Sequence, residues 1–444
     1  MRRLRTAADL AKWTGAGAVR EPGPAPADDA SGMFRSLRNF NYRLFLSGSV
    51  VSNVGTWMQR TAQDWLVLSL TGGSGTALGI TVALQFLPVM LFGMWGGVLA
   101  DRFPKRRLLM TAQSLMAALA LAMGVLTVTG HAEVWHVYVM AFTLGLLACV
   151  EVPTRQSFVV EMVGRDDLSN AIALNSSSFN LARVVGPAVA GLLINWLGGT
   201  GPLFLVNALT FAFTIGGLLL MRTAELRTPE PVKRGKGQAR EGLRYVLGNP
   251  DLLLPVLMVG FVAVFAQSFS TSIALMATEV FDAGASAFGI GSSAFAIGAV
   301  VGALLAARRV TPSRRIMVGA GVAFGAAQIL AAVTPAYWAF LIALVPAGLA
   351  MITVQTMANS TLQLGASNEM RGRVMGIYVL VFTAGAPIGA PLIGWIAELA
   401  GPRVGIMVSG LLSLTGVALA VLITRLVAAR KAMTLNPAAA TIAV

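Results

Sequence analysis

The sequence predicts an all-α integral membrane protein with twelve transmembrane helices in two six-helix bundles. Of its 444 residues, 56% are hydrophobic and only 12% are charged, whereas ordinary soluble domains carry about 25% charged residues. A hydrocarbon core about 30 Å thick needs about 20 mainly apolar residues per helix, and twelve such segments follow one another along the chain. The composition therefore excludes a soluble globular domain, and no segment shows the short alternation of an outer-membrane strand.

The twelve segments define the expected domain organisation. Glycine (48 residues) and proline (19 residues) recur within them, which membrane helices tolerate. The longest connection, residues 222–249, follows the sixth segment and is basic; its part 238–247 is expected to form an interfacial helix. We expect a disordered cytoplasmic tail at 1–33, a first bundle at 34–222, a linker at 223–250, a second bundle at 251–428 and a cytoplasmic tail at 429–444. The segments are centred near Thr56, Pro88, Met116, Thr143, Arg183, Phe211, Val264, Ile297, Ala326, Pro346, Gly385 and Leu412.

The positions of the basic residues explain the net charge of +14. All but three of the 33 Lys and Arg residues lie in the termini or in alternate loops; the exceptions are Arg60, Arg183 and Arg403. This is the positive-inside pattern, and it predicts a multi-pass protein of the plasma membrane with both termini in the cytoplasm. Contact with anionic lipid explains the basic excess, so we expect no nucleic-acid partner.

The loop after the second segment carries the most specific motif. It resembles the signature G-x-x-x-D-R-x-G-R/K-R/K of the major facilitator superfamily. The matching residues are Gly97, Asp101, Arg102, Lys105 and Arg106, and Pro104 replaces the usual glycine. The segment 96–102 recurs in weaker form at 302–308. The resemblance implies two duplicated halves with a binding site between them.

An acid in the fourth segment extends this motif. Glu151 and Arg155 lie four residues apart, toward the cytoplasmic end. The resemblance implies that an acid at this place pairs with the basic loop and closes the cytoplasmic side as a gate, made of Gly97, Asp101, Arg102, Lys105, Arg106, Glu151 and Arg155. The alternative interpretation is that these charges set the topology and cap helix ends.

Ionisable residues inside the membrane need a partner or a function, because each costs about 2.5–3.5 kcal/mol at mid-helix. Arg60 and Asp64 lie four residues apart and share one helix face. One interpretation is proton coupling, with Asp64 carrying the proton and Arg60 modulating it; the other is a static ion pair that closes the outer end. The second half has no ionisable residue away from its helix ends, so any ion coupling is expected in the first half. Possible polar residues of a substrate cavity are Asn53, Gln63, Gln267, Gln355 and Asn359.

The fifth segment resembles the G-P-x-x-G-G motif that marks exporters in this superfamily. Gly186, Pro187 and Gly191 match it, whereas Ala190 replaces one glycine. Asn180 and Arg183 lie on the same helix face as Pro187, and we expect them at the cavity. The alternative is that these small residues only let helices pack closely.

Several stretches together resemble one branch of the superfamily. The stretches 40–45, 64–71, 96–107, 170–191 and 370–375 are similar to the enterobactin-exporter-like and macrolide-efflux-like proteins, also called transmembrane secretion effectors. The resemblance implies a monomeric bacterial transporter that works by alternating access, exporting small amphipathic molecules such as drugs or siderophore-like metabolites in exchange for protons. A nutrient importer or uniporter, and a non-transporting membrane sensor or interaction protein, are the alternatives. We found no nucleotide-binding loop, metal-ligand spacing or nucleophile elbow. We therefore expect no enzyme activity, no catalytic residue, no metal and no cofactor other than the proton gradient.

Overall fold

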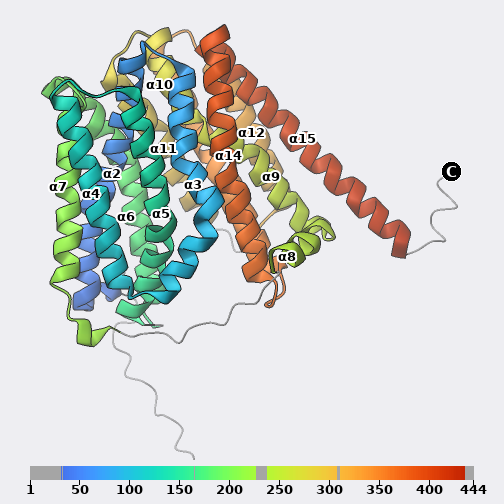
Figure 1. Ribbon diagram of the computed structural model, residues 1–444. Helices are drawn as coiled ribbons and strands as arrows, with labels where there is room; N and C mark the ends of the chain where they lie inside the picture. Colours follow the sequence, from blue (N-terminus) through green and yellow to red (C-terminus); the bar gives the residue numbers. More distant parts are fainter. Residues whose placement is uncertain (1–31, 33, 165, 227–237, 308–310, 436–444) are drawn as a thin grey trace, which may run out of the picture.

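The computed structural model describes residues 32, 34–164, 166–226, 238–307 and 311–435, and in this part of the chain the regular structure is helical (Figure 1). After a short 3₁₀ turn, six long helices form what we call the first bundle. Asn39 begins the first of them by accepting a hydrogen bond from the Tyr42 amide, and Gly72 ends it in the left-handed conformation. The elements are η1 (Arg35–Arg38), α2 (Phe40–Thr71), α3 (Gly75–Arg102), α4 (Lys105–Val128), α5 (Val134–Val163), α6 (Leu168–Leu197) and α7 (Gly201–Leu219).

A second bundle follows the linker and lies beside the first (Figure 1). Its first transmembrane segment is broken near Ser268 into α9 (Pro250–Gln267), α10 (Phe269–Leu275) and the π-helical turn η3 (Met276–Val280). Interrupted helices of this kind are common at transporter binding sites. The remaining helices are α11 (Ala285–Ala307), α12 (Arg314–Val333), α13 (Tyr337–Gly365), α14 (Arg371–Ala400) and α15 (Pro402–Leu435).

The linker carries the short helix α8 (Gln238–Leu247), at the residues where a helix was expected. It packs on α14 and α9, and Glu241 forms an ion pair of 2.6 Å with Arg373 near the start of α14. This contact attaches α8 to the second bundle.

The prediction of a helical membrane protein is confirmed. In the described residues, eleven helices are long and apolar enough to cross a membrane when α9, α10 and η3 count as one segment. The helix that fails this test is α2, which has 32 residues but buries Asn53, Gln59 and Gln63. Eleven of the twelve predicted centres lie inside these eleven segments, and the twelfth, Thr56, lies inside α2. The polar residues of α2 have to face protein rather than lipid.

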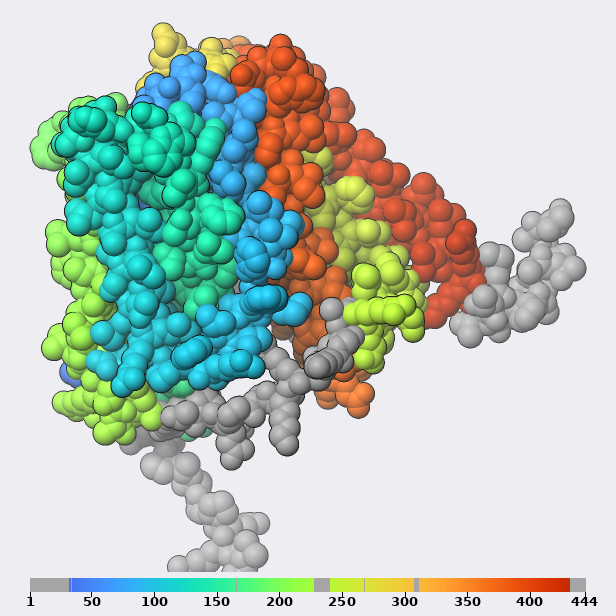
Figure 2. All heavy atoms as spheres, in the orientation of Figure 1, coloured from blue at the N-terminus to red at the C-terminus, as the bar shows by residue number. Residues whose placement is uncertain are grey.

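The two bundles meet along two helix pairs, α3 with α14 and α6 with α11. Small residues allow the backbones to approach closely. A methyl group on Gly75 would lie 2.5 Å from the Gly394 carbonyl oxygen, and Gly79 faces the Ala390 carbonyl in the same way. Figure 2 shows the atoms of α3 and α14 in contact where α3 begins.

These contacts distinguish the two ends of the molecule. We call the end with the turn between α3 and α4 the basic end, and the end with the turns at 72–74 and Gly401 the opposite end. Several hydrogen bonds join the bundles at the opposite end or near the middle of the long helices. They run from Ser74 Oγ and Thr76 N to Glu398 Oε2 (both 2.9 Å), from Asn195 Nδ2 to Ser286 Oγ (2.7 Å), from Ser286 Oγ to the Gly191 carbonyl (3.1 Å) and from Ser293 Oγ to the Val184 carbonyl (2.7 Å). These hydrogen bonds hold the bundles together at the opposite end.

Candidate functional site

A cavity of about 130 Å³ lies between the two bundles, lined by residues from the middle parts of several long helices. Helices α2, α3 and α6 line it from the first bundle, and α9, α10 and α11 line it from the second. We call it the central cavity. Its lining residues are Trp57, Arg60, Thr61, Asp64, Val82, Gln85, Phe86, Arg183, Pro187, Ala266, Ser270, Ile273, Phe288, Ser292, Phe295 and Ala296.

The charge in this cavity comes from one side. Arg60, Asp64 and Arg183 are the ionisable residues among its lining residues, and all belong to the first bundle. The second bundle contributes Ser270, Ser292 and apolar side chains, including two phenylalanines. This distribution agrees with the sequence, in which spans seven to twelve carry no ionisable residue away from their ends.

Trp57 lies beside both arginines of the central cavity. The guanidinium carbon of Arg60 is 5.0 Å from the centre of the Trp57 ring, and that of Arg183 is 5.7 Å away. Both distances are in the range of cation–π contacts. Gly186 allows this arrangement, since a methyl group there would lie 2.5 Å from the Trp57 Cβ. Phe179 supports the ring from the side, edge-on at 5.7 Å.

Arg60 and Asp64 face the same cavity, one helical turn apart on α2. Among the described residues no ion pair joins them, although they are close enough for their charges to interact. Arg60 instead lies over Trp57 and, at 5.9 Å, over Phe86 of α3. The Asp64 carboxyl group is therefore available to the cavity rather than held in a closed ion pair.

The exporter-like motif on α6 is divided between the cavity and the bundle contact. Arg183 and Pro187 line the cavity. Gly191 faces α11, where a methyl group would lie 2.6 Å from the Ala285 carbonyl oxygen. Asn180 donates a hydrogen bond of 2.9 Å to the Ser176 carbonyl on its own helix and is not among the lining residues.

The polar candidates of the second half lie elsewhere. The Asn359 Oδ1 atom accepts a hydrogen bond from Gln363, and the Gln355 carbonyl accepts a long one of 3.5 Å from Tyr378. Neither residue lines the central cavity. The side chain of Gln267 lies outside the described residues. In the first half, Gln63 is buried, with no hydrogen-bond partner for its Oε1 atom.

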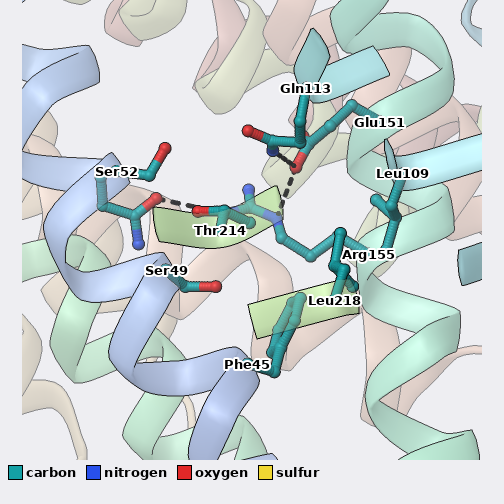
Figure 3. Close-up of a pocket in the computed structure, with 10 residues that line it drawn as sticks. Phe45, Ser49, Ser52, Leu109, Gln113, Glu151, Arg155, Thr214 and Leu218 are labelled. Carbon is teal, nitrogen blue, oxygen red and sulfur yellow. Dashed lines mark hydrogen bonds and ion pairs between the residues drawn. The ribbon is translucent and has the colours of Figure 1, made fainter. Parts of the chain in front are cut away.

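A second polar cluster lies inside the first bundle, toward the basic end (Figure 3). Glu151 is 6% exposed and forms an ion pair of 3.2 Å with Arg155, one turn along α5. Gln113 of α4 donates to the Glu151 carboxylate at 3.4 Å, and Arg155 Nη1 donates to Asn53 Oδ1 at 3.3 Å. The cluster thus connects α2, α4 and α5, and only about 10 Å³ of space remains beside it.

The basic loop pairs with a different acid from the one expected. Lys105 Nζ lies 2.5 Å from Glu161 Oε1, near the end of α5. Arg106 donates to the carbonyl oxygens of Leu218 and Leu219, at 2.6 and 3.2 Å, where α7 ends. These contacts stay within the first bundle, so they brace α4 against α5 and α7. Sequence spacing did not single out Glu161.

The glycine that matters most for packing in this motif is Gly96 rather than Gly97. A side chain at Gly96 would collide with the Cys149 carbonyl of α5, and Gly97 is only half-buried. Asp101 and Arg102 are exposed where α3 ends. The close contact between α3 and α5 therefore places the basic loop beside Glu161.

A contact between the bundles at the opposite end was also missed by sequence reasoning. Glu398, close to the end of α14, accepts two hydrogen bonds of 2.9 Å, from Ser74 Oγ and from the Thr76 amide. Ser74 also caps α3 by accepting a hydrogen bond from the Ala77 amide. We call Ser74, Thr76 and Glu398 the opposite-end clasp. The acid could not be paired from the sequence, because its partners are more than 320 residues away.

Comparison with known proteins supports the family and the fold. A family model described as transmembrane secretion effector matches residues 31–441. The chain is 26% identical to the multidrug efflux pump Tap of Mycobacterium tuberculosis, over 81% of this chain and 87% of that protein. It is 24% identical to the enterobactin exporter EntS of Salmonella choleraesuis, over 75% of this chain and 80% of that protein. A bacterial homologue of the human lysosomal transporter Spinster, solved in an inward-facing and unoccupied conformation, shares the fold with a TM-score of 0.66 and 14% identity, over 87% of this chain and 97% of that one.

Proposed function

The chain belongs to the transmembrane secretion effectors of the major facilitator superfamily, and on this basis we propose that it is a proton-coupled exporter of small amphipathic molecules. The observation that carries the proposal is the central cavity, which lies between two bundles and holds ionisable groups at membrane depth. Ionisable residues at that depth are costly and mark substrate or ion pathways. The efflux function named for Tap and EntS supports the outward direction.

Alternating access follows from the way in which the bundles meet. They are joined at the opposite end and near mid-membrane, by the opposite-end clasp and by small-residue contacts such as that of Gly75 with Gly394. The positive-inside pattern puts the basic end in the cytoplasm. With that orientation, contacts between the bundles at the outer end are those expected of an inward-facing state, in which an exporter receives its substrate.

The transition to an outward-facing state would move each bundle as a unit. The contacts of Lys105 and Glu161, and of Glu151, Arg155 and Gln113, lie within the first bundle. They hold this bundle together during the movement and do not need to break. The contacts between bundles at the opposite end, such as the opposite-end clasp, would have to separate in this movement.

Asp64 is the proposed proton carrier, because it is the carboxyl group among the residues that line the central cavity. One charge that crosses 100 mV supplies about 2.3 kcal/mol, and a tenfold concentration gradient costs about 1.4 kcal/mol. Entry of one proton per substrate is therefore sufficient for an outward gradient of tenfold or more.

Efflux from a pump-deficient bacterial host tests the proposal. Cells expressing the chain are loaded with amphipathic compounds of differing charge, and efflux is measured with and without a protonophore. We expect protonophore-sensitive efflux that is lost in Asp64→Asn. Asp251→Asn serves as the control, because this carboxyl is exposed at the start of α9 and away from the cavity.

The outcome separates export from its rivals. Full efflux by Asp64→Asn would remove Asp64 from the coupling step. Accumulation in right-side-out vesicles, with none in inverted vesicles, would contradict export and indicate an importer.

A further inference from the structure

The charge of the central cavity indicates which substrates it accepts. Two guanidinium groups and one carboxylate line it, which leaves a net charge of +1 when Asp64 is ionised. The cavity lies at membrane depth, where an uncompensated charge is unfavourable. A ligand that supplies one negative charge would neutralise it.

Arg183 is the group that lacks a counter-charge. Arg60 has Asp64 one turn away on its own helix. Arg183, on α6, forms no ion pair among the described residues, and the nearby charge of Arg60 repels it. Its guanidinium group lies against the ring of Trp57, at 5.7 Å. Such a guanidinium is suited to bind a carboxylate or sulfonate through two parallel hydrogen bonds.

A cationic ligand is disfavoured by the same charges of the central cavity. It would approach two like charges and only one carboxylate. The aromatic residue nearest to these charges, Trp57, is already engaged by both guanidinium groups, so its ring offers less to a ligand cation. The remaining wall, from the second bundle, is apolar apart from two serines and includes Phe288 and Phe295. This wall suits the apolar body of a ligand.

We propose that the central cavity binds an amphipathic organic anion, whose acidic group pairs with Arg183 and whose apolar body packs on the second-bundle wall formed by Phe288 and Phe295. The proposal rests on the proposed function, because it names the substrate class of the same site. It concerns binding alone, so it can be tested without any transport.

The charge on Asp64 also affects how proton entry can be coupled to anion export. Neutralising Asp64, by a proton or by mutation, raises the net charge of the cavity from +1 to +2, so the anion then binds more tightly. A proton on Asp64 and the anion therefore do not displace each other from the cavity, and such competition cannot be what couples proton entry to anion export. The coupling must depend on which loaded forms of the protein can change conformation.

The test is a binding measurement on the purified full chain in lipid nanodiscs, with three probes that share a naphthalene ring and carry a small polar group of different charge. The probes are 2-naphthoate, the neutral 2-naphthamide and the 2-naphthylmethylammonium cation. We expect wild type to bind naphthoate at least about tenfold more tightly than the cation, a difference of about 1.4 kcal/mol. Arg183→Gln should weaken naphthoate binding by a similar factor, with little change for the amide.

Two further variants complete a charge series. Asp64→Asn should strengthen naphthoate binding, and Arg183→Lys, which keeps the charge without the planar fork, should bind more tightly than Arg183→Gln. Arg425→Gln removes an exposed charge on α15 and is the control. Size-exclusion profiles and melting curves verify that each variant is folded.

The results distinguish this proposal from the proposed function. Equal or tighter binding of the cation, unchanged naphthoate binding by Arg183→Gln, or no naphthoate binding by folded wild type would each overturn the anion proposal. If the charge series holds and cells show no efflux, export fails while the substrate class stands. If cells export cations alone, the anion proposal fails while export stands.

Discussion

Replacing Glu398 by alanine should shift the protein toward a state that is open at the opposite end. The carboxylate accepts two hydrogen bonds of 2.9 Å across the bundle boundary, from Ser74 Oγ and the Thr76 amide. Hydrogen bonds to charged groups contribute about 1.5–3 kcal/mol each when they are protected from water. Glu398 is exposed, and exposed charged pairs contribute only about 0–1 kcal/mol. We therefore expect a total of about 1 kcal/mol, which corresponds to a change of about fivefold in the ratio of the two states.

Distances between spin labels measure this ratio directly. The single cysteine, Cys149, is buried, so a Cys149→Ala background lets labels be placed at the exposed positions Leu70 and Leu399. These positions lie on different bundles at the opposite end. The longer distance should gain population in Glu398→Ala, and Glu398→Gln, which keeps an acceptor oxygen, should show a smaller gain.

Glu133→Gln is the matched control for this experiment. Glu133 is also an exposed acid at the opposite end, but its hydrogen bonds stay with α5. If Glu398→Ala gave the wild-type distance distribution, or if Glu133→Gln shifted it equally, the opposite-end clasp would have no specific part in closing the protein.

Three further predictions concern packing and pairing. Lys105→Ala should lower the melting temperature, because it leaves the nearly buried Glu161 carboxylate without its partner, and the charge swap Lys105→Glu with Glu161→Lys should recover part of the loss. Gly96→Val should prevent folding or lower the melting temperature strongly, since α5 backbone occupies the space, whereas Gly372→Val, with nothing within 4 Å, should be tolerated in expression and melting assays. Trp57→Leu removes a ring that contacts two guanidiniums, each worth about 0.5–2 kcal/mol, and should lower the melting temperature more than Trp57→Phe does. The first prediction is contradicted if Lys105→Ala melts at the wild-type temperature. The second is contradicted if the two glycine variants lower the melting temperature equally, and the third if the two Trp57 variants do so.

The second bundle also shows how far residue type alone can mislead. Gln355 and Asn359 were candidates because amides in membrane helices tend to face protein. The structure places both on α13, away from the central cavity, and the cavity takes its polar atoms on that side from Ser270 and Ser292. A serine hydroxyl can also bond to a carbonyl of its own helix, so it gives little sequence signal.

The sequence by itself determined the features that depend on neighbours along the chain. Segments of sufficient length and hydropathy predicted the helices, and the i, i+4 spacing placed Glu151 and Arg155 one turn apart on one helix, where the structure has them as an ion pair. Spacing on one helix also placed Arg60 and Asp64 on a common face.

Only the tertiary structure decided which helices are adjacent. Lys105 pairs with Glu161, 56 residues away, and Glu398 pairs with Ser74, 324 residues away. Arg183 shares the ring of Trp57 with Arg60 because Gly186 lets α6 approach α2 closely. Periodicity fixes the face of a helix on which a residue lies, whereas the neighbour of that face depends on the packing of all helices together, which no local pattern records.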